Sequence, residues 1–319
     1  MGIDGFGAFL KKFAPRAFAQ VSPATFLGKR LAFDCTLKLY TLFFRNQGHE
    51  GAALKDLASF VRTLDDMHIQ AVFVLDGHTR GLKPRAHEER AAASVRAKEG
   101  VQRAEAALLK PITCTADLFT RATEVKRARL RAAQPSPSFF VKCQDVLARG
   151  TGTVVRAEDD AERHIAGLVA TGSVDYAVSK DYDTLVFGAP HLVLDFPVAG
   201  DATVVTLATA LEDLRLPNRE ALVDLAIMAG CDFTPKLPKV GPVTAWKAIL
   251  AHGTIEKAQE ARAVPIGPEG FDPDFARARF FGREVVPKPA TEAATAPEGA
   301  GAAQDAEDAA APDPSKEEV

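Results

Sequence analysis

The chain alternates short apolar runs with longer amphipathic stretches. Acidic residues follow four of the apolar runs, at 31–33, 71–75, 174–178 and 192–194. The stretches at 52–67, 84–108, 138–149 and 160–170 have the amphipathic pattern of helices. Strands that alternate with helices are typical of an α/β fold, in which helices flank a mostly parallel central sheet on both faces.

Two regions depart from this alternation. Residues 84–131 are predicted to be helical, basic and rich in alanine, with an interruption at Pro111. They are too polar for a core, so we expect them to project from the sheet. From 207 to 258 the pattern is wholly helical, which indicates that the chain leaves the sheet there.

The composition is that of an intracellular protein. With 319 residues, 47% of them hydrophobic, the chain is long enough to bury a real core. No apolar run approaches the roughly 20 residues of a membrane helix. Lys11, Lys12 and Arg16 interrupt what could otherwise be the apolar core of a signal peptide. Four widely spaced cysteines show neither zinc spacing nor a disulfide framework, which favours a reducing compartment.

Charge is distributed unevenly. Residues 287–319 carry two lysines against eight acids, and this Ala/Pro/Glu-rich segment is predicted to be a disordered acidic tail. The remaining 286 residues are therefore mildly basic, although the whole chain has a net charge of −3. Residues 83–131 hold twelve basic against six acidic residues. Either a solvated helical face or a phosphate-binding surface would explain this excess, and composition does not decide between them.

Seven acidic residues form the candidate site. Most follow predicted strands, and the carboxyl ends of parallel strands meet at one edge of a sheet. Asp and Gly also end strands in ordinary turns, which is the alternative for each residue alone. A cluster of oxygen ligands without His or Cys suits Mg²⁺ or Mn²⁺, and two such ions about 4 Å apart can promote phosphodiester cleavage. The seven residues are Asp34, Asp76, Asp160, Glu162, Asp181, Asp183 and Asp232.

Local alternatives exist for several of these acids. In extended chain, the spacing of Asp181 and Asp183 would aim both carboxylates to one side, where they repel unless a cation lies between them; a solvated turn would also hold them. Asp159 and Glu162 fit a capping box that opens the helix at 160–170. Asp232 follows a glycine and could be a loop residue after a helix.

Six blocks, in this order, resemble the flap endonuclease (XPG-type) family over residues 1–286. The family forms are MGI.GL, a first strand with its helix, VFDG, EA.SEAEA, EDMDCLTFGSP and LGSDY…GIGPKTA. Here they read MGIDGF at 1–6, LAFD at 31–34, VFVLDG at 72–77, AEDDAE at 157–162, KDYDTLVFGAP at 180–190, and MAGCDF with VGPVTA at 228–233 and 240–245.

The resemblance implies a PIN-like 5′ nuclease fold and roles for named residues. All seven acids would be carboxylates of a site for two Mg²⁺ ions, which Mn²⁺ can replace, with Asp160 standing for a longer glutamate. Lys83 and Arg90 would be catalytic, contacting the scissile phosphate. Their position after the VFDG-like block favours this role over ordinary membership of a basic helix.

DNA-binding residues are also implied. Tyr40 resembles the aromatic residue that stacks on a base near the cut, although helix 36–44 could simply bury it. Gly2 would place the N-terminal amine near the site. In the helix–hairpin–helix at 228–249, Gly241 permits close backbone approach and Pro242 begins a helix. Lys239 replaces the family's first hairpin glycine, so it is expected to bind phosphate through its charge.

The resemblance thus implies a structure-specific 5′ nuclease that cuts branched DNA, such as a 5′ flap, in replication or repair. A 5′–3′ exonuclease, an RNA-cutting relative and a catalytically silent branched-DNA-binding module are the alternatives. The expected catalytic domain covers 1–286, with an N-terminal region at 1–110, an arch at about 83–135 and an internal region at about 138–258. We expect an intracellular monomer, in the nucleus or cytoplasm, without membrane contacts. A sliding-clamp partner is not supported, because the sequence has no glutamine-led aromatic clamp motif.

Overall fold

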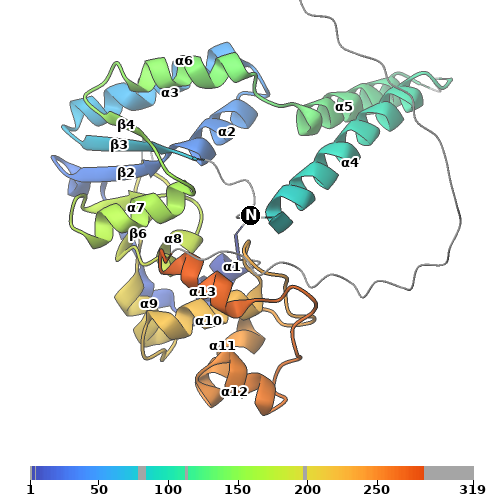
Figure 1. Cartoon of the computed structure of the whole chain (residues 1–319). Coiled ribbons are helices and arrows are strands. Elements are labelled where there is room, and N and C mark those ends of the chain that lie inside the picture. The colour runs from blue at the N-terminus through green and yellow to red at the C-terminus, as the bar shows by residue number, and fades with distance from the viewer. Residues whose placement is uncertain (1, 4, 78–83, 112–113, 197–199, 284–319) are drawn as a thin grey trace, which may run out of the picture. The chain divides into compact units, whose positions relative to one another are not determined.

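A computed structural model describes residues 2–283, apart from 4, 78–83, 112–113 and 197–199; in 84–90 it describes the backbone alone. All these residues belong to one compact unit, residues 1–286. Figure 1 shows a sheet between two layers of helices, with a helical pair projecting to one side. The acidic tail predicted at 287–319 and Lys83 lie outside the described residues.

The described strands form one seven-stranded sheet in the order β1-β7-β6-β5-β2-β3-β4. Pairs among β2 to β6 are parallel, and β7 pairs antiparallel with both β6 and β1, which confirms a mostly parallel sheet. No acid-terminated apolar run marks the strands β1, β4 and β7, which the sequence pattern did not predict. The bounds are β1 Phe18–Val21, β2 Arg30–Asp34, β3 Gln70–Leu75, β4 Thr153–Arg156, β5 Tyr176–Val178, β6 His191–Val193 and β7 Ala202–Thr206.

The strand order places a switch point between β2 and β5. From β2 the chain proceeds through β3 to β4 on one side, and β5 then pairs with the other side of β2. Connections that leave a parallel sheet in opposite directions open a crevice at the carboxyl ends of the two central strands. A site at this edge is therefore built into the topology.

Helices cover both faces of the sheet. The helices α2 (Cys35–Arg45), α3 (Glu50–Asp66) and α6 (Pro137–Leu147) bury their apolar sides in one core. On the other face, α1 (Phe6–Phe13) and α7 (Ala161–Ala170) share a second core with the C-terminal helices. The helices predicted at 52–67, 138–149 and 160–170 are confirmed, with their ends at most two residues from the predicted positions.

The projecting pair consists of α4 (Pro84–Leu108) and α5 (Thr115–Ala132), which pack against each other. In α5, Val125 is the one buried side chain. The prediction that this polar segment stands away from the core is confirmed (Figure 1).

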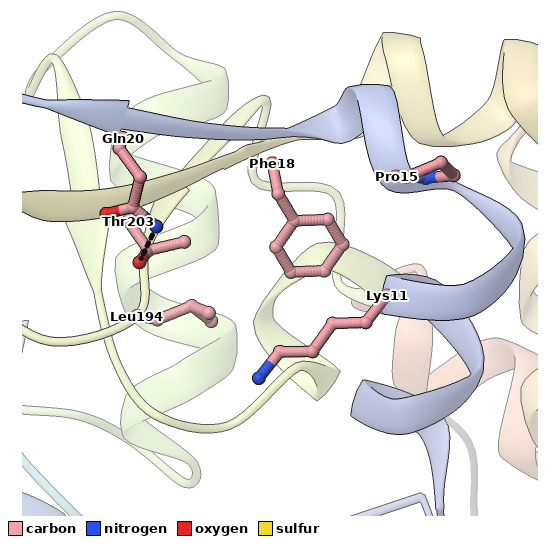
Figure 2. Close-up of a pocket in the computed structure, with 6 residues that line it drawn as sticks. All are labelled: Lys11, Pro15, Phe18, Gln20, Leu194 and Thr203. Carbon is pink, nitrogen blue, oxygen red and sulfur yellow. Dashed lines mark hydrogen bonds between the residues drawn. The ribbon is translucent and has the colours of Figure 1, made fainter.

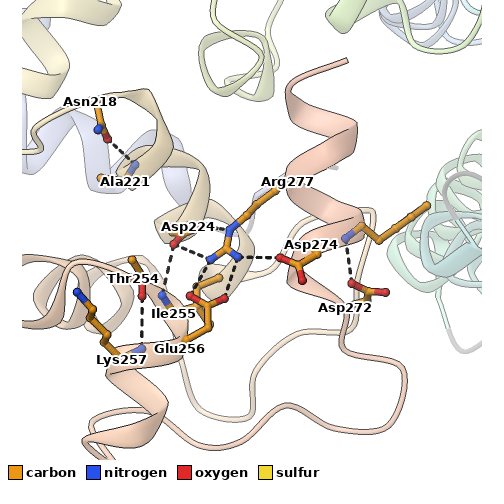
Figure 3. Close-up of polar contacts among 11 residues, drawn as sticks. Asn218, Ala221, Asp224, Thr254, Ile255, Glu256, Lys257, Asp272, Asp274 and Arg277 are labelled. Carbon is orange, nitrogen blue, oxygen red and sulfur yellow. Dashed lines mark hydrogen bonds and ion pairs between the residues drawn. The ribbon is translucent and has the colours of Figure 1, made fainter. Parts of the chain in front are cut away.

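The C-terminal region is helical, as predicted for 207–258. Its elements are α9 (Leu207–Asp213), α10 (Arg219–Ala229), α11 (Pro242–His252), α12 (Ile255–Glu260) and α13 (Pro273–Phe280), after the one-turn helix α8 (Asp183–Val186). Arg277 joins three of them (Figure 3): its Nε lies 2.6 Å from Asp224 Oδ1 on α10, and its Nη1 lies 2.8 Å from Glu256 Oε1 on α12. Among the described helices, none is long and apolar enough to cross a membrane.

Candidate active site

Four neighbouring parallel strands deliver six of the seven candidate acids to one edge of the sheet. Asp34 ends β2, and Asp76 follows β3. The segment after β4 carries Asp160 and Glu162, and the segment after β5 carries Asp181 and Asp183. The seventh acid, Asp232, follows α10 instead.

Asp34 and Asp181 lie on either side of the switch point and share a serine. The Ser179 hydroxyl donates to Asp34 Oδ2 at 3.0 Å, and its oxygen accepts the Asp181 N–H at 3.0 Å. Asp34 Oδ1 also accepts the Leu37 N–H at 3.2 Å, so it caps α2. Ser179 therefore fixes the spacing of two acids that come from neighbouring strands.

Asp76 is held against the start of α7. Its Oδ1 accepts the Ala161 N–H at 3.0 Å, and its own N–H donates to Thr36 Oγ1 at 2.9 Å. A carboxylate at a helix N-terminus is stabilised by the exposed N–H groups there. The same turn carries Asp160 and Glu162, so three acids from two strands meet at this point.

The predicted capping box at Asp159 is wrong. Asp160 is the N-cap of α7 and makes no side-chain capping hydrogen bond. Asp159 lies one residue earlier, where its buried carboxylate forms ion pairs with Arg163 and Arg279. Two arginines satisfy Asp159 better than one helix N–H could. Arg163 lies four residues later, at ordinary helical spacing, whereas no local pattern reveals Arg279.

Asp181 and Asp183 do approach each other, but not in extended chain. Asp183 is the first residue of α8, and its N–H donates to Asp181 Oδ1 at 3.0 Å. The turn, rather than strand alternation, places both acids on one side. Gly2 lies against them, because a Cβ there would come within 2.5 Å of Asp181 Oδ1, and the Ile3 N–H donates to Asp183 Oδ1 at 3.1 Å.

These acids repel one another. Burial, with the charges of Asp76 and Asp181, raises the pKa of Asp34 from 3.8 to about 6. Burial also raises the pKa of Asp181. Burial raises the pKa of Asp183 well above its ordinary value, and the charges of Asp181, Asp232 and Glu162 add to the rise. Asp34, Asp76, Glu162, Asp181, Asp183 and Asp232 thus form one electrostatic group, and the buried Asp160 caps the helix that carries Glu162.

The donor set suits a hard divalent cation. Every candidate ligand is a carboxylate oxygen, and a cation would offset both the burial and the mutual repulsion that raise the pKa values of Asp34, Asp181 and Asp183. Within the described part of the chain, no three Asp, Glu, His or Cys side chains are arranged to enclose one ion. Magnesium keeps several waters and needs only one or two direct carboxylates, so this open cluster fits a hydrated ion.

A hollow of about 1100 Å³ adjoins the acids. Asp34, Asp76, Glu162 and Asp181 line it from the sheet side. Tyr40 lines it from α2, where its ring also packs on Phe140 with a centroid distance of 5.5 Å. Small residues of α4 between 91 and 97, and Arg131 on α5, also line it.

Lys83 and the side chain of Arg90 lie outside the described residues. Exposed Lys239 has a left-handed backbone with φ 60°, the conformation that glycine adopts most easily. Gly241 is the N-cap of α11 and Pro242 its first residue, as expected.

The sequence reasoning missed several residues around the acids. Ser179 and Thr36 give no signal, since isolated hydroxyl residues are common everywhere. Lys180 also lines the hollow, and its Nζ lies 3.1 Å from Asp195 Oδ2. Lys180 did give a signal, because this chain has a lysine where the family form EDMD has its first glutamate.

A second hollow, of about 270 Å³, lies between α1 and the antiparallel side of the sheet. Its described lining includes one cation, Lys11, and no acid, and the Gln20 amide donates to Thr203 Oγ1 at 2.8 Å (Figure 2). Phe18 and Leu194 make the rest of it largely apolar. Its lining offers no metal ligands, so the candidate site is the acidic edge.

Comparisons with known proteins cover most of the chain. The model of the XPG N-terminal domain matches residues 1–97, and that of the XPG I-region matches 153–232. Flap endonuclease 1 of Neurospora crassa is 31% identical over 306 residues, covering 90% of this chain and 74% of the relative.

Solved structures with the same fold include flap endonuclease-1 from Methanococcus jannaschii. It has a TM-score of 0.60 at 22% identity, covering 89% of this chain and 86% of that one. The Holliday junction-resolving enzyme GEN1, in complex with product DNA and Mg²⁺, has a TM-score of 0.56 at 20% identity, covering 91% and 66%. The PIN-like fold expected from the sequence is confirmed.

Proposed function

This chain belongs to the flap endonuclease family of XPG-type nucleases, and on that premise we propose that it hydrolyses phosphodiester bonds of branched DNA near a 5′ end, with Mg²⁺ as cofactor. Its relatives are flap endonucleases by name, and a neighbouring enzyme was solved with product DNA and Mg²⁺. We further propose that it acts as a monomer inside the cell, where DNA is replicated or repaired.

The observation that carries the proposal is the grouping of carboxylates beside a hollow. Six acids from four strand ends and one helix end influence one another's charge, and four of them face a space of about 1100 Å³. Such a grouping is costly for a fold unless a cation neutralises it. A purely structural role would not require an open space beside it.

We assign the seven acids to holding two Mg²⁺ ions: Asp34, Asp76, Asp160, Glu162, Asp181, Asp183 and Asp232. When bound, such ions supply Lewis-acid chemistry and lower the pKa of a water molecule that attacks phosphorus. Ser179 and Thr36 orient Asp34, Asp181 and Asp76, while Lys83 and Arg90 are proposed to stabilise the charge that develops on the phosphate.

The route of the DNA follows from the basic surfaces. A 5′ single strand would enter the hollow between α2 and the pair α4–α5, where Tyr40 can stack on a base and Arg131 can contact a phosphate. The duplex would lie on the helix–hairpin–helix, where the N-terminus of α11 and Lys239 face phosphates. Two separate contacts would select a branched substrate over a linear one.

A cleavage assay with Mg²⁺ tests the proposal. A 5′-labelled flap, a nicked duplex and an RNA hairpin of matched length are incubated with the chain, and product lengths are mapped on one gel. A single cut near the base of the flap is expected. A ladder of short products from the nicked duplex would favour the exonuclease alternative, and cleavage of the hairpin alone would favour the RNA-cutting one.

Asp181→Ala is the matched control. It removes a proposed ligand at the hollow, so cleavage should be lost while flap binding, measured by anisotropy in Ca²⁺, stays within a few-fold of wild type. Wild-type cleavage by this variant would contradict the metal assignment. Binding without cleavage by the wild-type chain itself would favour the catalytically silent module.

A further inference from the structure

We propose that Arg279 on α13 is a positioning residue, which sets the divalent-metal affinity of the site by holding Asp159 in place. The inference rests on the proposed function, because it takes Asp160 and Glu162 as metal ligands. It assigns α13 a role in assembling the metal site as well as in packing.

Arg279 and Asp159 form a buried ion pair between distant segments of the chain. The Arg279 Nη2 donates to Asp159 Oδ2, and both residues are buried. Arg163 on α7 approaches the other oxygen, with its Nε 3.2 Å from Asp159 Oδ1. The Arg279 guanidinium also lies over the ring of Phe233, 5.8 Å from its centroid. A buried carboxylate with two cations has little freedom to move.

Asp159 in turn connects the segments that carry three of the acids. Its Oδ1 accepts the Asp160 N–H at 2.8 Å, and its carbonyl oxygen accepts the Gly77 N–H at 2.8 Å, next to Asp76. The backbones are in close contact here, since a Cβ on Gly77 would lie 2.1 Å from the Ala157 carbonyl oxygen. A displacement of Asp159 would therefore shift Asp76 and Asp160 together.

The next residue of α13 supports two further acid-bearing segments. The ring of Phe280 packs against Phe187, which ends the turn that begins at Asp183, with a centroid distance of 5.1 Å. It also packs against Phe233, the neighbour of Asp232, at 5.2 Å. Thus α13 contacts the three acid-bearing segments that follow β4, β5 and α10.

A second arginine on the same helix offers a matched control. Arg277 lies two residues before Arg279, but its guanidinium pairs with Asp224, Glu256 and Asp274 (Figure 3), none of which is one of the seven candidate acids. If α13 contributes only packing, loss of either arginine should affect the metal site alike. If Arg279 acts through Asp159, the two variants should differ.

The test measures Mn²⁺ binding in the absence of DNA, from the EPR signal of free Mn²⁺, at a temperature where circular dichroism shows every variant folded. We expect Arg279→Met to weaken binding about tenfold, the lower end of the effect of removing a group that orients metal ligands. Arg279→Lys should recover some of the loss. Arg277→Met should bind within twofold of wild type.

The double variant Asp159→Ser/Arg279→Met tests the route. Serine keeps an oxygen that can accept the Asp160 N–H, and both buried charges are gone. We expect it to bind Mn²⁺ no more weakly than Asp159→Ser alone. Additive losses in the double variant would overturn the proposed route through Asp159.

The remaining outcomes are separable. Equal Mn²⁺ affinity of Arg279→Met and Arg277→Met would overturn this inference while leaving the proposed function in place. A wild-type chain that binds no Mn²⁺ would overturn the proposed function, and the inference with it. If Arg279→Met does not fold, Arg279→Lys and Asp159→Ser provide the same comparison, with wild-type affinity in both as the contradicting result.

Discussion

Two buried carboxylates in this chain, Asp224 and Asp183, have opposite electrostatic surroundings. Asp224 is 5% exposed, and its oxygens accept hydrogen bonds from Arg277 at 2.6 and 2.8 Å. Asp183 is 7% exposed, yet its charged neighbours include the acids Asp181, Asp232 and Glu162. The first carboxylate has its cation within the fold, whereas the second is surrounded by like charge.

The difference distinguishes a structural from a functional acid. A fold gains nothing from several adjacent carboxylates unless a ligand neutralises them, because burial and mutual repulsion both oppose ionisation. The acidic edge is therefore expected to be less stable without metal, and the Asp224 network to be indifferent to metal. Substitutions at each place can separate these behaviours.

Asp183→Asn should have the largest effect. Loss of one proposed ligand should slow single-turnover cleavage by about 10³-fold, equivalent to about 4 kcal/mol of transition-state stabilisation. The same change should raise the unfolding free energy in EDTA, because it removes a buried charge from a repelling group. Quench-flow cleavage and urea unfolding measure the two effects. A variant that cuts normally, or that is less stable in EDTA, would contradict the comparison.

Arg277→Met should show the reverse pattern. It leaves Asp224 buried without its cation, so the unfolding free energy should fall by about 3 to 5 kcal/mol. Cleavage at a temperature well below unfolding should stay within twofold of wild type. Urea unfolding provides the measurement, and the double variant Asp224→Asn/Arg277→Met should regain some of the stability. Loss of cleavage without loss of stability would show that Arg277 serves the site and not the fold, contrary to this expectation.

The pH dependence of stability without metal gives an effect of intermediate size. The folded pKa of Asp34, about 6, exceeds its ordinary value of 3.8, so the folded state binds more protons between these values. The stabilisation is complete below about pH 4 and is lost as pH rises through about 6, on the order of 2 to 3 kcal/mol. Urea unfolding in EDTA from pH 4 to 7.5 should show a weaker pH dependence in Asp34→Asn. An unchanged profile would contradict the burial of a charged Asp34.

Lys180→Met should have the smallest effect on stability. Lys180 and Asp195 form a half-exposed pair, with side chains 46% and 54% exposed, and such pairs contribute about 0–1 kcal/mol. Because Lys180 lines the hollow, kcat/KM for the flap should still fall about fivefold at low salt, and less at high salt, where the phosphate charge is screened. A salt-independent loss would argue against a phosphate contact.

Much of the fold could be predicted from the sequence. Helices and strands follow from local periodicity, so α3, α6 and α7 were located to within one or two residues. The seven acids and their order along the chain were also evident, since an acid after an apolar run is a local pattern and the family blocks contain the others.

Contacts between residues that are distant in the sequence depend on the tertiary fold. Strand order places β5 beside β2, and this pairing brings Ser179 between Asp34 and Asp181. Asp159 fits a helix cap locally, but the fold supplies Arg279, 120 residues later, and the ion pair prevails. A single sequence encodes each residue's chemistry and its local conformation. Which buried charge meets which cation depends on packing between elements, and no local pattern specifies it.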